Sequence, residues 1–140
     1  MCGVYKGYYD DGKIKEECFH NNGTKEGEYK IYYQNGKLSE SCNYVSGYLH
    51  GSYKLYSNVG QLLTSCNYTC DIIDGYCLEY YDNGQIQETC CYDNGKRKGE
   101  CKEYYYDGQL KAVYIYMSME KLLRPVKNIF YMNHNVTYIK

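Results

Sequence analysis

Nine cysteines and three histidines are the residues of this 140-residue chain that offer the most chemistry. Thiolates and imidazoles are ligands of tetrahedral zinc, which takes four of them at metal–sulfur distances of about 2.3 Å. The densest candidate groups are Cys66, Cys70 and Cys77, and Cys90, Cys91 and Cys101. Whether either group can bind a metal depends on the elements that carry it.

The positions of the histidines do not indicate catalysis. His20, His50 and His134 fall in expected turns or in the C-terminal tail, and none is placed for a Ser/His/Asp or Cys/His pairing. The glycines keep positions suited to hairpin turns and never form the phosphate loop between a strand and a helix that a nucleotide site requires. We therefore predict no catalytic residue, no cofactor and no enzymatic activity.

The elements that must position these residues repeat with a period of 24 residues. The period is shared by Gly12, Gly36, Gly60, Gly84 and Gly108, by Tyr8, Tyr32, Tyr56, Tyr80 and Tyr104, and by Cys18, Cys42, Cys66 and Cys90. Such regularity is the signature of stacked structural repeats. Four full units with partial ends fill roughly residues 3–114.

Each unit contains two turn signals that separate two short strand patterns. Asn35-Gly36 is an example of the first turn and Asn22-Gly23 of the second, and Asn-Gly suits the positive φ angles of two-residue hairpins. The alternation predicts an all-β fold, a single curved antiparallel meander of about nine or ten strands over residues 8–112. The predicted cross-strand pairs are Tyr33 with Leu38, Tyr29 with Cys42, Tyr53 with Cys66, and Cys77 with Cys90.

Alternation of side chains along each strand then separates two faces. We expect the buried face to carry the periodic cysteines together with Ile14, Leu38, Leu62, Ile86 and Leu110. We expect the opposite, water-exposed face to carry lysines, glutamines and the tyrosines Tyr32, Tyr56, Tyr80 and Tyr104. The same register places Glu79 opposite Glu88, which like-charge repulsion disfavours.

The periodic cysteines recur on every second strand. At a strand spacing near 4.8 Å, successive members lie about 9–10 Å apart, which excludes a shared metal ion and a disulfide between neighbouring units. We therefore expect no metal site and small buried thiols that pack against tyrosines. Cys77 and Cys90 are the exception, because the register sets them opposite each other. Reduced thiols are expected there in a reducing compartment, and a cross-strand disulfide is the alternative.

Two stretches of the chain resemble the MORN repeat. They are Gly-Lys-Leu-Ser-Glu-Ser-Cys-Asn-Tyr at 36–44 and Tyr-Tyr-Asp-Asn-Gly-Gln-Ile at 80–86 with Gly-x-x-x-Gly at 95–99. The spacing is similar to that of the longer variant found in bacterial proteins described as antitoxins and in giant DNA viruses. The resemblance covers about four fifths of the chain and implies a module for interaction and positioning. The third unit departs from the motif at Ser57 and Asp71, so we expect an irregular turn over residues 70–74.

The chain changes character after Tyr116. The apolar side chains that follow share one helical face: Leu122, Leu123, Val126, Ile129 and Phe130. Pro125 interrupts that helix, so we expect short helical turns rather than one rod. We predict a repeat array over residues 1–116 and a short helical cap with a tail over residues 117–140, because a terminal repeat needs a cap for its apolar face.

Charge excludes one class of partner. The chain has 16 basic and 17 acidic residues, and a nucleic-acid-binding stripe needs a marked cationic excess. The same balance favours a membrane surface only weakly. The chain starts without an apolar signal segment and has no run long enough to span a bilayer, so we expect an intracellular, cytoplasmic protein that is also compatible with incorporation into a virion.

The candidate binding surface is the tyrosine row Tyr32, Tyr56, Tyr80 and Tyr104, because tyrosine combines a large contact area with a hydroxyl group. The alternative is that these side chains only cover the sheet. We predict a non-catalytic binding or scaffolding protein with a protein partner. A structural component of a large assembly, such as a giant-virus virion, and an antitoxin-like inhibitor of a partner enzyme are the alternatives. The sequence does not specify an oligomeric state.

Overall fold

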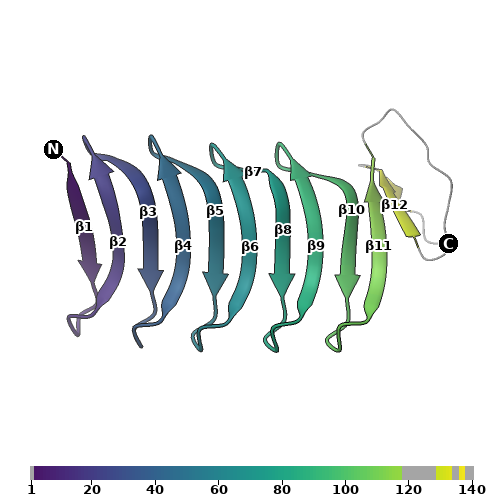
Figure 1. Ribbon diagram of the computed structural model, residues 1–140, viewed down its shortest axis with the longest axis horizontal. Helices are drawn as coiled ribbons and strands as arrows, with labels where there is room; N and C mark the ends of the chain where they lie inside the picture. The colour runs from purple at the N-terminus through teal and green to yellow at the C-terminus, as the bar shows by residue number, and fades with distance from the viewer. Residues whose placement is uncertain (1, 118–128, 134–135, 138–140) are drawn as a thin grey trace.

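The computed structural model of the chain describes residues 2–117, 129–133 and 136–137. These residues form one sheet in which successive strands lie side by side (Figure 1). The strands are β1 Gly3–Tyr8, β2 Ile14–Asn21, β3 Thr24–Tyr32, β4 Leu38–Val45, β5 Tyr48–Tyr56, β6 Leu62–Thr69, β7 Ile72–Ile73, β8 Gly75–Tyr80, β9 Ile86–Asp93, β10 Lys96–Tyr104, β11 Leu110–Tyr116, β12 Ile129–Asn133 and β13 Val136–Thr137. The predicted all-β antiparallel meander is confirmed.

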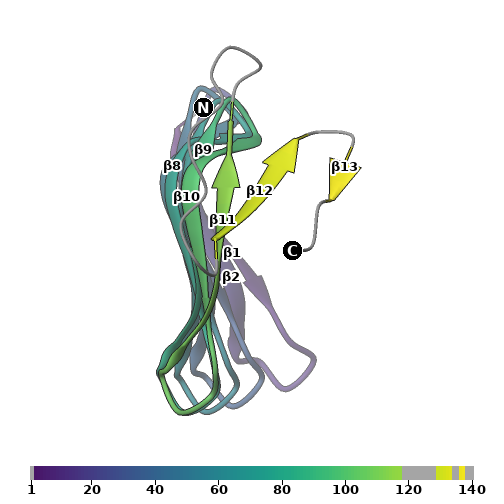
Figure 2. The ribbon, with the colours of Figure 1, turned by 90° about the vertical axis from the view of Figure 1, so that its right-hand side faces the viewer.

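The sheet is a single layer whose strands bend along their length (Figure 2). The first turns lie at one end of the strands and the second turns at the other end (Figure 1). Among the described residues the buried apolar side chains are Cys18, Tyr29, Cys42, Cys66, Cys77, Cys90, Cys101, Ala112 and Val113. A core this small leaves most side chains half-buried or exposed, so contacts between neighbouring strands must hold the fold together.

The first turn of each unit differs from the predicted two-residue hairpin. The Gly36 N–H donates to the Tyr33 carbonyl, and the Tyr33 N–H donates to the Lys37 carbonyl, each at 2.8 Å. The loop between them has three residues, of which Gly36 alone has a positive φ, 84°. This is a type I turn closed by a glycine in the left-handed region, a common three-residue hairpin loop.

An irregularity in the next strand compensates for the longer loop. Tyr32 pairs with Leu38, but Ile31 pairs with Glu40, so Ser39 is an extra residue in β4. Beyond this bulge the register returns to the predicted one. Three predicted pairs are therefore confirmed: Tyr29 with Cys42, Tyr53 with Cys66, and Cys77 with Cys90. The prediction that Tyr33 faces Leu38 is wrong.

The bulge also corrects the assignment of faces. Cross-strand partners point to the same side of a sheet, so Leu38 shares a side with Tyr32 and not with Cys42. The same correction applies to Ile14, Leu62, Ile86 and Leu110. The aliphatic set that we expected beside the cysteines therefore lies among the tyrosines of the opposite face.

The second turn is the predicted two-residue hairpin. Asn22 and Gly23 both have positive φ, 49° and 81°, as a type I′ turn requires. Cys70 and Asp71 adopt the same conformation in the third unit. The irregularity expected there follows the turn: the strand is divided into β7 and β8 around Asp74, whose N–H donates to the Asn67 carbonyl at 2.9 Å.

The C-terminal segment differs in part from the predicted cap. Ile129 and Phe130, which we expected on a helical face, begin β12, and β12 pairs in parallel with β11. The other residues of the predicted helical face lie in 118–128, outside the described residues. The division into an array over 1–116 and a cap over 117–140 stays a prediction.

Candidate binding surface

One row of tyrosine and aliphatic side chains crosses ten strands of the sheet, from β1 to β11 without β7. In each unit a tyrosine at the end of one strand pairs with a leucine or isoleucine at the start of the next, as Tyr32 does with Leu38. The members are Tyr8, Ile14, Tyr32, Leu38, Tyr56, Leu62, Tyr80, Ile86, Tyr104 and Leu110. We call this row the aromatic–aliphatic stripe and its side of the sheet the stripe face.

The four predicted tyrosines are all half-buried members of this stripe, but their hydroxyl groups differ. The Tyr32 hydroxyl donates to Glu17 Oε1 at 2.6 Å, and burial together with this hydrogen bond raises the pKa of Tyr32 to about 12. Within the described part of the chain, the hydroxyls of Tyr56, Tyr80 and Tyr104 have no hydrogen-bond partner. Three of the four tyrosines can therefore offer a hydroxyl to a ligand.

A second set of tyrosines holds neighbouring units together. The hydroxyls of Tyr9, Tyr33 and Tyr81 donate to backbone carbonyls of the next unit, those of Tyr32, Tyr56 and Tyr104, at 2.6, 2.7 and 2.8 Å. The third unit has Ser57 at this position, and the Ser57 Oγ accepts the Gln61 N–H of its own turn. These bonds fix the spacing between successive stripe tyrosines.

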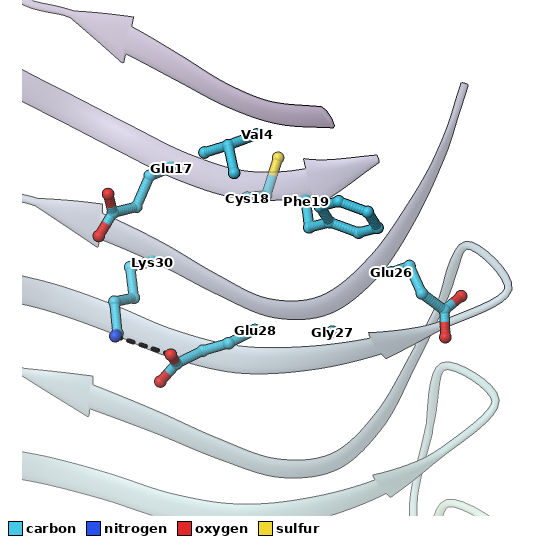
Figure 3. A pocket seen from close by; sticks show the side chains of 8 residues that line it. All are labelled: Val4, Glu17, Cys18, Phe19, Glu26, Gly27, Glu28 and Lys30. Atoms are coloured by element: carbon cyan, nitrogen blue, oxygen red, sulfur yellow. Dashed lines mark ion pairs between the residues drawn. The ribbon is translucent and has the colours of Figure 1, made fainter. Parts of the chain in front are cut away.

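A hollow of about 420 Å³ opens at the N-terminal end of the stripe face (Figure 3). Val4 and Phe19, which are cross-strand partners, supply its apolar part. Three carboxylates and one ammonium surround them, those of Glu17, Glu26, Glu28 and Lys30. Lys30 Nζ lies 2.7 Å from Glu28 Oε2. The hollow thus suits a ligand group in which an apolar part lies next to a positive charge.

The other side of the sheet, the cysteine face, carries a second row of side chains. Its members in strand order are Tyr5, Cys18, Tyr29, Cys42, Tyr53, Cys66, Cys77, Cys90, Cys101 and Tyr114. Tyrosine and cysteine alternate in the first half, whereas four cysteines follow one another in the second. We call Cys66, Cys77, Cys90 and Cys101 the four-cysteine row.

Disulfide bonds join Cys66 to Cys77 and Cys90 to Cys101. Cys77 and Cys90, the predicted thiol pair, are register partners, but each is bonded to its other neighbour. No two of the periodic cysteines Cys18, Cys42, Cys66 and Cys90 are bonded to each other, but the expectation that they are all free thiols is wrong for Cys66 and Cys90. Each of these two is bonded to a cysteine of the neighbouring strand, since Cys77 and Cys101 follow Tyr29 and Tyr53 at the same 24-residue step.

The structure also places the remaining members of the two candidate zinc groups. Cys70 is exposed in a second turn, and Cys91 is half-buried on the strand of Cys90 but points to the stripe face. Among the described residues, no three potential ligands are arranged to hold a metal ion.

His20 and His50, which we expected in turns, lie in β2 and β5, and one cysteine–histidine contact was missed from the sequence. Cys18 Sγ lies 3.6 Å from His20 Nδ1, because residues two apart on a strand share a face. Burial raises the pKa of the Cys18 thiol, whereas a nucleophilic cysteine needs a lowered pKa. The His20 ring packs edge-on against Tyr5, with ring centroids 5.8 Å apart. The contact is therefore one of packing.

Comparison with known families agrees with this geometry. The family model of the MORN repeat variant matches residues 1–22, 25–46, 73–94 and 97–116, more than half of the chain. The chain is a MORN-repeat protein. The unmatched residues 47–72 hold most of the third MORN unit, where Ser57 and Asp71 depart from the motif. No curated protein matches the chain.

MORN repeats are in general non-catalytic and are commonly associated with scaffolds that bind proteins or membranes. Among the described residues of this MORN protein, no helix is long and apolar enough to cross a membrane.

Proposed function

We propose that this MORN protein is a non-catalytic scaffold that binds a protein partner through the aromatic–aliphatic stripe. The continuity of the stripe carries the proposal: half-exposed tyrosines and aliphatic side chains follow one another over ten strands. Contiguous apolar surface of this kind marks interaction sites. Tyrosine adds contact area at a low cost in conformational entropy.

The charges beside the stripe favour a protein over the two polyanionic alternatives. The next row of the same face has few positive charges among neutral and acidic side chains: Glu17, Lys30, Ser41, Lys54, Ser65, Leu78, Thr89 and Lys102. The hollow at one end of the stripe is acidic. A nucleic acid or an anionic membrane would require an excess of positive charge along the whole surface.

The identity of the partner distinguishes three forms of this proposal. A capsid-type protein would make the chain a structural component of a large assembly such as a virion. A toxin enzyme would make it an antitoxin-like inhibitor. Any other single protein would make it a general scaffold. In all three cases we propose that the protein acts inside the cell.

Photo-crosslinking from the stripe tests the proposal in the native source. A photoreactive phenylalanine analogue replaces Tyr56 or Tyr80 on the stripe face, and Tyr68 on the cysteine face serves as the matched control. We expect both stripe positions to crosslink the same protein and Tyr68 to crosslink none. Equal crosslinking from Tyr68, or none from the stripe, would contradict the proposal.

The purified pair then gives a quantitative test. Tyr80→Ala should weaken binding about thirtyfold if Tyr80 is a hot spot worth about 2 kcal/mol. Tyr5→Ala is the control, because Tyr5 is 48% exposed and lies on the cysteine face, away from the stripe. Circular dichroism verifies that both variants keep the sheet.

A further inference from the structure

The four-cysteine row places four sulfur atoms on neighbouring strands along one line. The Cα atoms of Cys66 and Cys77 are 4.2 Å apart, and those of Cys90 and Cys101 are 4.3 Å apart. Cys77 and Cys90 are direct partners in the ladder between them. Close and wide pairs alternate in an antiparallel ladder, at Cα distances of about 4.5 and 5.5 Å. The two disulfides therefore occupy close pairs, and Cys77–Cys90 is the wide pair.

The row is isolated from the other thiols of the described chain. Cys77 is the most exposed of its four members at 8%, and Cys101 is fully buried. On the same face Cys42 lies between Tyr29 and Tyr53, so its sulfur meets aromatic rings rather than another sulfur. Sulfur can reach sulfur along the ladder only from Cys66 to Cys101.

We propose that the four-cysteine row is a thiol–disulfide exchange site in which a disulfide moves between neighbouring pairs through Cys77–Cys90. The first step requires an external dithiol reductant. It reduces the Cys66–Cys77 disulfide, the more exposed of the two, to two thiols and is itself oxidised to a disulfide, so two electrons and two protons pass to Cys66 and Cys77.

The second step needs no further oxidant or reductant. The Cys77 thiolate attacks Cys90 Sγ, the Cys77–Cys90 bond forms, and the Cys90–Cys101 bond breaks. Cys101 leaves as a thiolate and takes up the proton that Cys77 lost. The attacking and leaving residues lie on opposite sides of Cys90, because Cys77, Cys90 and Cys101 are successive partners across three neighbouring strands.

The exchange changes which strands are covalently joined. The outer disulfides join β6 to β8 and β9 to β10 across second turns, and thus join one MORN repeat to the next. A Cys77–Cys90 disulfide joins β8 to β9 across the first turn of a single repeat. Reduction and exchange together would therefore release the covalent links between repeats while the sheet stays paired.

Disulfide mapping of a Cys101→Ser variant tests the exchange in the full chain. The background is Cys70→Ser with Cys91→Ser, so that each relevant peptide carries a single cysteine. The protein is oxidised with glutathione disulfide, quenched with acid and alkylated. Cleavage after Lys54 and before Asp71, Asp74, Asp82 and Asp93 then separates Cys66, Cys77 and Cys90 from one another in mass spectrometry. We expect peptides linked through Cys66–Cys77 and through Cys77–Cys90, both as major products.

Cys42→Ser is the matched control, because Cys42 is a buried cysteine of the same face with tyrosine neighbours. It should leave the linkage pattern unchanged. A Cys101→Ser protein that holds only Cys66–Cys77, with Cys90 fully alkylated, would overturn the proposal.

A measurement on the chain with all its cysteines covers the case in which Cys101→Ser does not fold. Less than one equivalent of dithiothreitol is added, and samples are quenched over time. The Cys77–Cys90 linkage should rise from trace level while the two outer linkages fall. Loss of the outer linkages without any Cys77–Cys90 product would show that the sulfur atoms do not exchange.

Discussion

The two halves of the cysteine face stabilise the same backbone by different means. In the first half Tyr29 is buried between Cys18 and Cys42, its ring meets that of Tyr44 edge-on at 5.8 Å, and Lys25 Nζ lies 3.9 Å from the Tyr29 ring centroid. In the second half disulfides replace the tyrosines. A single-layer repeat can thus hold neighbouring strands either by aromatic packing or by covalent bonds.

The charged row next to the cysteines differs between the halves as well. Glu79, Glu88 and Glu103 are successive partners in the second half, so the opposed carboxylates that the sequence analysis expected to be unfavourable do occur. Arg97 compensates, because its guanidinium lies 2.7 Å from Glu88 and also donates to the hydroxyls of Tyr92 and Tyr116. The equivalent positions in the first half include Ile31 and Leu55, which carry no charge.

Removal of both disulfides should give the largest effect and should be confined to the second half. Cys77→Ser with Cys90→Ser prevents every disulfide of the row. Each bond closes a loop with a sequence separation of 11, and a loop of that size contributes about 3 kcal/mol. Urea unfolding measures the loss of stability. Hydrogen exchange should accelerate in β6 and β8–β10 and stay unchanged in β2–β4, and equal acceleration in β2–β4 would refute the comparison.

Removal of a buried tyrosine ring should destabilise the first half locally, as loss of the disulfides destabilises the second half. Tyr29→Ala removes a ring that is 8% exposed and should cost about 3 kcal/mol, as large-to-small changes at buried sites do. Tyr76→Ala, at a tyrosine that is 68% exposed, should change stability by less than about 0.5 kcal/mol. Hydrogen exchange should now accelerate in β2–β4. A loss of protection confined to β8–β10 would be the contrary result.

The tyrosine hydrogen bonds between units can be removed in one unit and introduced in another, and each change should have a smaller effect on stability. Tyr33→Phe removes one bond to the Tyr56 carbonyl and should cost about 0.5–1.5 kcal/mol. Ser57→Tyr should restore the missing bond to the Tyr80 carbonyl and recover part of that amount, because the Gln61 N–H loses its Ser57 partner. Thermal unfolding of the two variants compares the contributions. Destabilisation by Ser57→Tyr would show that the third unit cannot accept the bond.

The fold was predictable because its period and turn residues are explicit in the sequence. Gly36 was correctly placed in a turn, but the turn type was not, since Asn-Gly fits both a two-residue loop and a three-residue loop ending in glycine. The error did not spread to Tyr29 and Cys42, because the extra residue Ser39 restored the register. It did spread to Leu38, which lies between the turn and the bulge.

The candidate surfaces were predictable only in part for the same reason. The stripe tyrosines were identified from their period, but their pairing with aliphatic side chains depends on the bulge, which no residue type announces. The four-cysteine row had a visible signal, since Cys77 and Cys101 occupy the period of Tyr29 and Tyr53. The positions 29, 53, 77 and 101 follow one another at steps of 24 residues, and this series predicts that all four side chains lie in one row.

The smallest expected effect is a difference in pH dependence between one carboxylate of each half, Glu88 in the second half and Glu17 in the first. Burial raises the pKa of Glu88, repulsion from Glu79 and Glu103 adds to it, and Arg97 opposes it. A carboxyl group with a raised folded-state pKa binds more protons when folded, so its ionisation lowers stability as pH rises from its ordinary value of 4.5 through its folded-state pKa. Glu88→Gln should therefore match the parent protein below that window and exceed its stability at neutral pH, despite the lost ion pair.

Glu17, on the stripe face of the first half, is the control with the opposite sign. The hydrogen bond from Tyr32 lowers the pKa of Glu17, and Lys6 adds to the effect. Its ionised form therefore stabilises the fold above the ordinary value of 4.5, and that contribution is lost as pH falls through the folded-state pKa. Glu17→Gln should be less stable than the parent at neutral pH and equal to it in acid. Urea unfolding at both pH values compares the two variants. If Glu88→Gln behaved like Glu17→Gln, the Arg97 ion pair would outweigh burial and repulsion, and the two halves would not differ in this respect.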